Sequence, residues 1–185
     1  MKNIKLLVVP LYLFTIIAAN VVTASIDPLQ IGAFIVPAGS FLIGFTFFLR
    51  DFVQNAIARK GAYLAMAIAV ILSALTSYFL GDTLWIVFAS AITFIISETA
   101  DTEIYTRLKL PLSIRVFYSG VVGGFLDSVV FVVIGLSPLG AGFIPWSAVP
   151  MAIIGQMIVK ILMQLLAAIA ISVVVKKQRK FQHLN

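Results

Sequence analysis

The sequence predicts an all-α membrane protein, a bundle of six transmembrane helices with both termini in the cytoplasm. Its 185 residues are 62% hydrophobic and 11% charged, whereas a soluble domain is about half apolar and about a quarter charged. Its apolar residues also gather into six runs. Each run approaches or exceeds the ~20 residues that a helix needs to cross a ~30 Å hydrocarbon core. Finally, Lys and Arg fall almost entirely on one side of the resulting topology.

The six runs make the whole chain, 1–185, one integral membrane domain. They cover about residues 6–25, 31–49, 62–80, 84–103, 116–136 and 148–175. The segments between them are rich in turn residues or in charge, at residues 27–28, 50–61, 81–82, 107–115 and 137–145.

The charge distribution predicts the orientation of these runs. With the N-terminus inside, twelve of the thirteen Lys and Arg residues lie on the cytoplasmic side, and no outer connection carries one. We therefore expect a multipass protein of the cell inner membrane whose basic charge faces anionic lipid. The pattern argues against nucleic-acid binding through the KKQRK tail. It also argues against a cleaved signal peptide, because the first run is needed as a span.

The first two runs contain buried polar groups and a predicted helix break. Asn20 places an amide in the first run. The second run contains Pro37 and Gly39, and because proline lacks an N–H donor, this helix is expected to kink or unwind locally. Transporters use such breaks to present backbone groups to a ligand, although ordinary membrane helices kink too.

The fourth run ends in acidic residues that lie either inside the membrane or in water beyond it. Only fourteen apolar residues precede Glu98, which is ~21 Å of helix and too short to cross. The helix is therefore expected to continue to about Glu103, carrying a single polar face into the inner part of the membrane: Glu98, Asp101, Thr102 and Tyr105. The alternative is a tilted helix or thinned bilayer that leaves the acids in water.

The last two runs each contain a charged residue too far from the ends of its span to reach interfacial water. Asp127 and Lys160 are both ~16–22 Å from the cytoplasmic ends of their helices, so they can pair. A charge at that depth marks a functional site or a structural ion pair. Gln156 and Gln164 lie on the same helical face as Lys160. The GxxxG spacing of Gly120 and Gly124 allows close helix approach beside Asp127.

Together these groups favour a site for a small, flat, hydrogen-bonding solute. A carboxylate accepts adjacent N–H donors of a guanine-like ring, amides pair with its other polar atoms, and aromatic rings stack on it. The acids could instead relay protons or bind a coupling cation. A channel would more naturally use rings of a symmetric oligomer, and a helical scaffold would bind no solute.

An enzyme is disfavoured. The chain has no GxSxG, HExxH or P-loop motif, no Cys, and one His, His183, near its C-terminus. Asp101 with Asp127 is a formal candidate pair for intramembrane aspartyl proteolysis, but that reading leaves Lys160 unexplained. We expect no catalytic residue, metal or cofactor.

At these residues the sequence resembles the vitamin uptake transporters, a family that includes queuosine-precursor carriers. The resemblance covers most of the chain and rests on the order of five segments: AAN, GAFIVPAGSF, SETADTEIY, GGFLDSVVF and VKILMQ. The matching polar residues are Asn20, Asp51, Asp101, Asp127 and Lys160. Glu98 stands where some members are expected to have an amide.

The resemblance implies uptake of a deazaguanine such as 7-cyano-7-deazaguanine, a precursor of the modified tRNA base queuosine. Glu98 or Asp101 is expected to accept the N–H edge of this base. Gln156 and Gln164 would complete the hydrogen bonding, and the Asp127–Lys160 pair would switch on binding. The family also resembles the six-helix substrate-binding subunits of energy-coupling-factor transporters.

This second resemblance sets the alternative function, a vitamin-binding subunit that needs a separate ATPase module. The expected partners are the solute and the lipid bilayer, with an ATPase module or a second copy as further candidates. A small-residue face of Gly61, Ala65 and Ala69 on the third run would suit docking of a partner.

Overall fold

The computed structural model describes residues 2–26, 29–32, 34–82 and 84–182, apart from the side chains of 2–6, 24, 35 and 173–182. The predicted turn at Asp27 and Pro28, the side chains of the basic tail, and His183 therefore lie outside the described residues. In chain order the elements are α1 (Lys2–Ser25), β1 (Leu29–Ile31), β2 (Phe34–Val36), α2 (Ser40–Phe79), α3 (Leu84–Arg107), α4 (Leu112–Val130), the π-helix η1 (Phe131–Leu136) and α5 (Val149–Gln182).

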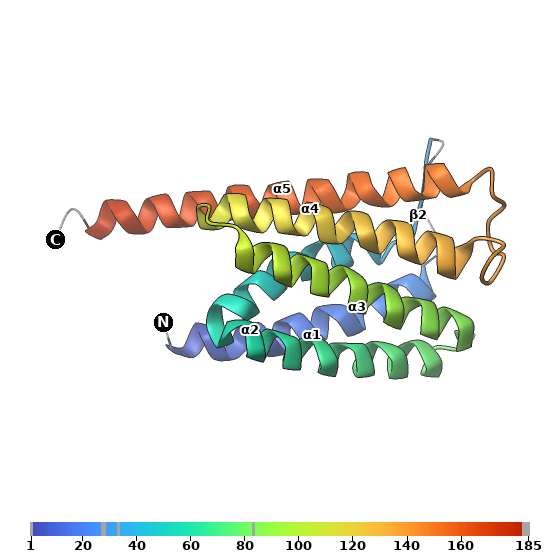
Figure 1. The fold of residues 1–185 in the computed structure, drawn as a ribbon, viewed down its shortest axis with the longest axis horizontal. Helices are drawn as coiled ribbons and strands as arrows, with labels where there is room; N and C mark the ends of the chain where they lie inside the picture. Colours follow the sequence, from blue (N-terminus) through green and yellow to red (C-terminus); the bar gives the residue numbers. More distant parts are fainter. Residues whose placement is uncertain (1, 27–28, 33, 83, 183–185) are drawn as a thin grey trace.

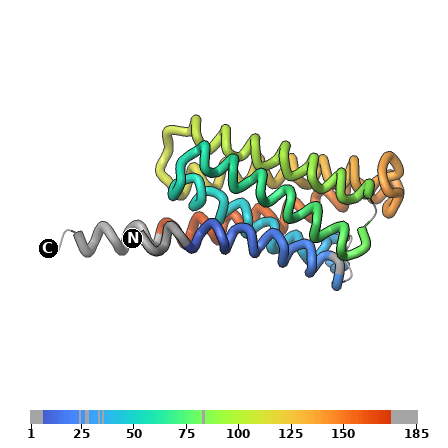
Figure 2. The backbone as a smooth tube through the Cα atoms, turned by 90° about the horizontal axis from the view of Figure 1, so that it is seen from below, coloured from blue at the N-terminus to red at the C-terminus, as the bar shows by residue number. Residues whose placement is uncertain are grey.

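The helices form an elongated bundle. They run along one common axis in both views (Figures 1 and 2). Helix α2 lies centrally, since it packs against α1, α3 and α5, while α4 packs between α3 and α5. One end of the bundle, here the basic end, is formed by the bend of α2 and the α3–α4 connection (Figure 1). The sequence around these two points contains Arg59, Lys60, Arg107, Lys109 and Arg115. The opposite end, the hairpin end, carries β1 and β2 (Figure 1).

Helix α2 consists of two helical arms joined at one residue. Ala58 has φ 61° and ψ 175°, so the helix reverses direction there without a loop. The prediction that residues 50–61 form a charged connection is therefore wrong for its first half. Arg50 and Asp51 lie inside the first arm, and both are 1% exposed.

The predicted helix over residues 31–49 also differs from the structure. Strands β1 and β2 pair antiparallel, with Leu29 opposite Val36, so the described fold is not purely helical. The helix starts only at Ser40, after Pro37 and the N-cap Gly39. The expected break is thus the boundary between the β-hairpin and the helix. The helix does not extend back through Pro37, because proline has a fixed φ and no N–H donor.

Helix α3 continues well past the point where its apolar run stops. It ends at Arg107, and its polar face is buried: Glu98 is 1% exposed, Asp101 0% and Tyr105 4%. The prediction that this helix carries its acids into the bundle is confirmed, and the alternative of acids in water at the interface is wrong. Glu103, which is not part of this polar face, retains 24% side-chain exposure.

The last two helices begin and end close to the predicted limits. Helix α4 starts at Leu112, and its run closes in η1, where Ser137 N donates to Val132 O over five residues. Such π-helical turns occur frequently at functional sites. Helix α5 extends to Gln182, beyond the predicted limit near residue 175.

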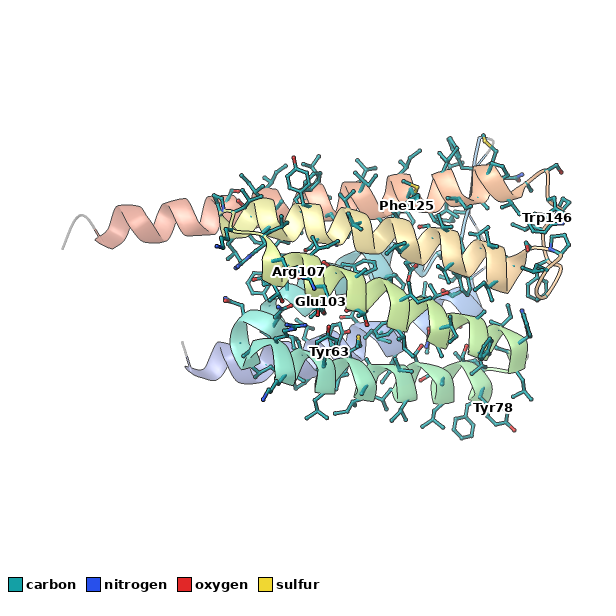
Figure 3. All side chains as sticks on the ribbon, viewed as in Figure 1. Tyr63, Tyr78, Glu103, Arg107, Phe125 and Trp146 are labelled. Carbon is teal, nitrogen blue, oxygen red and sulfur yellow. The ribbon has the colours of Figure 1, made fainter. Side chains whose placement is uncertain are left out.

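The described part of the chain is an α-helical membrane protein. Four of its helical segments are long and apolar enough to cross a bilayer, namely Ser40–Phe79, Leu84–Arg107, Leu112–Leu136 and Val149–Ser172, and α1 adds a shorter apolar stretch, Leu7–Thr23. Large apolar side chains cover the outside, as at Phe125 of α4 (Figure 3). Tyr78 and Trp146 lie exposed toward the hairpin end (Figure 3), where amphipathic aromatic rings suit a membrane–water interface.

The small-residue face of α2 is an internal contact. Ala65 and Ala69 are 3% and 0% exposed and pack in one cluster with Tyr12 and Ile16 of α1. Small side chains let two membrane helices approach closely. The prediction that this face is open for docking of a partner is therefore wrong.

Candidate functional site

A cavity of about 540 Å³ opens in the hairpin half of the bundle. Residues from every helix line it, and Pro37 and Gly39 contribute the start of α2. Its volume falls within the ~300–1,000 Å³ typical of small-molecule sites. Its lining mixes hydroxyl, amide and charged groups with phenylalanine rings, including Phe94 and Phe131.

The floor of the cavity is built around Lys160 of α5. Its ammonium group donates to Asp127 Oδ2 at 2.5 Å, to Ser128 Oγ at 2.9 Å and to Gln156 Oε1 at 3.2 Å. These contacts use all three donors of a lysine. The predicted pairing of Asp127 with Lys160 is confirmed. Lys160 is buried, while Asp127 keeps 13% side-chain exposure toward the cavity.

Two groups on the cavity wall have unused hydrogen-bonding capacity. Gln156 Nε2 and Thr93 Oγ1 are buried and have no hydrogen-bond partner. On the opposite side, Asn20 Nδ2 donates to Ser73 Oγ at 2.9 Å and to Ser73 O at 3.1 Å, which orients the amide. A buried polar group without a partner costs about 1–3 kcal/mol, so such groups are typically satisfied by a ligand or by water.

A second polar centre, here the Arg50 cluster (Arg50, Asp51, Glu98 and Asp101), lies deeper, outside the cavity lining. Arg50 Nε contacts Glu98 Oε2 at 3.3 Å, and one terminal nitrogen, Nη2, pairs with both Asp101 and, at 3.2 Å, Asp51. A further nitrogen donates to Thr102 Oγ1 at 3.0 Å. These charged side chains are at most 1% exposed, so the cluster joins α2 to α3 inside the bundle.

Glycines of α4 make room for both polar centres. A Cβ at Gly124 would lie 3.3 Å from Lys160 Cβ, and one at Gly120 would meet the side chain of Gln164 at 2.6 Å or less. On the neighbouring face, a Cβ at Gly123 would lie 3.0 Å from Asp101 Cβ. The close approach predicted from the Gly120–Gly124 spacing is thus present, and it brings α4 against α5.

The basic end is closed by contacts between α2 and α3. Glu103 pairs with Arg59 and accepts from Tyr63 Oη at 2.6 Å, and Arg107 reaches its other oxygen at 3.3 Å (Figure 3). One turn away, Gln54 Nε2 donates to Thr106 Oγ1 at 2.8 Å. These contacts lie beyond the Arg50 cluster, on the side away from the cavity.

The structure divides the predicted site residues into two groups. Asn20, Asp127, Gln156 and Lys160 line the cavity together with the break residues Pro37 and Gly39. The other four do not line it. Glu98 and Asp101 pair with Arg50, Tyr105 accepts from Arg115 at 3.1 Å, and Gln164 Nε2 donates to Gly44 O at 3.2 Å.

Arg50 and Thr93 were not identified from the sequence. Arg50 was assigned to a cytoplasmic connection because a charge at the end of an apolar run reads as a topology signal. The helix that starts at Ser40 has only ten residues before Arg50, which is ~15 Å and too short to cross. A helix that crosses the membrane from Ser40 must therefore carry Arg50 into it, as α3 carries Glu98.

Together, the apolar surface, the helices aligned along one axis and the cavity lined by polar and aromatic groups define an integral membrane protein with room for a small solute. The family model described as "Putative vitamin uptake transporter" matches residues 64–174, more than half of the chain. The protein belongs to this family of vitamin uptake transporters. Family and fold both point to a transporter rather than an enzyme. No curated protein and no solved structure matched the chain.

Proposed function

We propose that the protein is a six-span carrier of the inner membrane that imports a queuosine precursor, 7-cyano-7-deazaguanine or a related deazapurine. In this proposal both arms of α2 cross the bilayer, both termini are cytoplasmic, and the basic end faces the cytoplasm. The gathering of Arg59, Lys60, Arg107 and Lys109 at that end supports the orientation. The cavity then opens in the outer half of the membrane, from which an imported solute arrives.

The observation that carries the proposal is the unused hydrogen-bonding capacity above the Asp127–Lys160 floor. A deazaguanine offers adjacent N–H donors, a carbonyl acceptor and a flat ring. Asp127 can accept the donors, because its carboxylate is held in place by Lys160 and remains partly exposed to the cavity. Gln156 Nε2 can donate to the carbonyl. Phe94 and Phe131 supply aromatic faces for stacking.

In this assignment Glu98, Asp101, Tyr105 and Gln164 support the site from behind. They fix the positions of α2, α3, α4 and α5 around the cavity floor through their contacts with Arg50, Arg115 and Gly44. The solute is bound by Asn20, Asp127, Gln156 and Lys160.

The test is uptake in cells that can neither synthesise queuosine precursors nor import them. Such cells receive nanomolar 7-cyano-7-deazaguanine, and queuosine in tRNA is measured. The native chain should restore the modification, whereas Asp127→Asn and Gln156→Glu should not, because each removes a group assigned to the base. Glu103→Gln is the matched control, since it neutralises an acid outside the cavity. Restoration by Asp127→Asn would refute the site.

The alternative is a vitamin-binding subunit that works only with a separate ATPase module. The same cavity serves either function, so flux decides between them. Liposomes that contain this chain alone should accumulate the solute if the chain is a carrier. Tight binding without flux would favour the energy-coupling-factor arrangement.

A further inference from the structure

The Arg50 cluster contains more acid than base. Asp51, Glu98 and Asp101 bring three carboxyl groups, each at most 1% exposed, to a single guanidinium. The next cation is Arg115, which acts electrostatically on Asp51 while its guanidinium stacks 4.1 Å from the Tyr105 ring. Full ionisation would leave three negative charges facing two positive ones. An uncompensated charge inside a membrane bundle is strongly unfavourable, so the cluster requires one more positive charge.

A second observation shows where hydrogen bonding is incomplete. Asp101 places Oδ2 on Arg50, but its Oδ1 has no hydrogen-bond partner although the side chain is fully buried. All the other groups of the cluster that could donate to it belong to Arg50. A proton on a neighbouring carboxyl group would both remove the excess charge and turn an acceptor into a donor.

A proton fits this cluster better than a metal ion. A sodium or calcium ion needs several oxygen atoms converging on one point. Among the described residues, no group of three acidic, His or Cys side chains has the geometry to hold a metal. A proton needs a single oxygen.

Glu98 is the carboxyl group best placed to hold the proton. It contacts Arg50 only through Nε, at 3.3 Å, whereas Asp101 and Asp51 share a terminal nitrogen. It also lies next to the cavity floor, because its neighbour Ser97 reaches Asp127 Oδ1 at 3.5 Å and Asp127 acts electrostatically on it. A change at the floor on solute binding is therefore felt at Glu98.

Every helix packed around the cluster contributes a titratable or charged group to this environment. The groups are Tyr12 of α1, Arg50 and Asp51 of α2, Asp101 and Tyr105 of α3, Arg115 and Asp127 of α4, and Lys160 of α5. Tyr12 is fully buried with its hydroxyl beside Glu98.

We propose that the Arg50 cluster holds one exchangeable proton on Glu98, and that this proton is carried inward with each solute molecule. The inference rests on the proposed carrier function and adds its energy source. When a rearrangement of the bundle exposes the cluster to water on the cavity side, the Glu98 carboxylate accepts a proton from a hydronium ion, which forms the O–H bond and leaves a water molecule. After the bundle opens at the basic end, the same bond breaks and the proton passes to cytoplasmic water. No electron is transferred.

The experiment uses the full chain in liposomes with a pH-sensitive dye inside and the membrane potential clamped at zero. An inward proton gradient is imposed, and accumulation of 7-cyano-7-deazaguanine is measured together with internal acidification. With one proton per solute, accumulation should rise about tenfold for each unit of pH gradient. Glu98→Gln should abolish this accumulation while solute exchange across the membrane at equal pH continues. Glu103→Gln, the same change on the same helix outside the cluster, should keep the tenfold rise in accumulation for each unit of pH gradient, even if the rate changes because Glu103 helps to close the basic end.

A second measurement does not depend on transport. The infrared spectrum of the purified protein should contain a protonated carboxyl band that shifts in heavy water, is lost in Glu98→Gln and is kept in Glu103→Gln. Solute flux that ignores the pH gradient, or follows a sodium gradient, would overturn the proton proposal and leave the carrier function standing. Absence of solute binding would overturn the carrier function, and the infrared band alone would then decide whether Glu98 holds a proton.

Discussion

Lys160→Ala tests the floor of the cavity most directly. The substitution removes three hydrogen bonds and leaves Asp127 as an unpaired charge on α4. Breaking a buried ion pair by removing one partner costs about 3–5 kcal/mol. Because Asp127 is 13% exposed to the cavity, part of its charge can be hydrated. We therefore expect a loss near the lower limit, about 3 kcal/mol.

The free energy of unfolding can be measured by titrating the protein with sodium dodecyl sulfate in mixed micelles. Lys109→Ala is the matched control, since that lysine is exposed and its loss should change stability by less than about 0.5 kcal/mol. The double variant Asp127→Asn with Lys160→Met removes both charges. It should regain at least about 2 kcal/mol over Lys160→Ala but should still fail to bind solute. A double variant as unstable as Lys160→Ala would refute the assignment of the cost to an unpaired charge.

Three further substitutions test other contacts. Arg50→Met leaves three buried acids without their shared partner and should cost at least about 3–5 kcal/mol. Arg59→Met breaks a pair that is 50% exposed on the arginine side, so it should lower stability far less; equal losses in detergent titration would contradict the burial argument. Gly120→Ala drives a methyl group into Gln164 and should cost about 1–3 kcal/mol, part of which Gln164→Ala should restore in thermal unfolding. Gly39→Ala places Cβ 2.5 Å from a backbone oxygen of α1 and so displaces the start of α2, which lines the cavity. Solute affinity measured by calorimetry should fall at least about tenfold, equivalent to ~1.4 kcal/mol. Unchanged affinity would show that the start of α2 can move without affecting the cavity.

The depth of each charged residue in the membrane predicted more of this site than short sequence motifs did. The buried acids of α3 and the Asp127–Lys160 pair followed from the length a helix needs to cross and from the cost of a charge in the membrane. Arg50 escapes the same prediction because the apolar run before it extends back to residue 31 in the sequence and is long enough to cross by itself. Once β1 and β2 form a hairpin, the arm from Ser40 must continue past Arg50 to gain length.

The division of the polar residues between two centres could not be predicted from the sequence. Helical periodicity places Gln156, Lys160 and Gln164 on one face of α5. It does not show which neighbouring helix each side chain contacts. In the structure, Gln156 reaches the cavity while Gln164 donates to the backbone of Gly44. That difference depends on how α2 and α4 cross α5, which is set by the small residues at the crossings and by long-range packing.

The reversal at Ala58 has a consequence for biosynthesis. The first arm of α2 contains Arg50 and Asp51, and each charge raises the free energy of insertion by up to about 2.5–3.5 kcal/mol at the centre of an isolated helix. The second arm, residues 59–79, is mostly apolar and carries no charged residue beyond Lys60. Because a single residue joins them, we expect the two arms of the proposed topology to enter the bilayer together as a helical hairpin. The apolar arm then offsets the insertion cost of the charged one until α3 arrives with its acids.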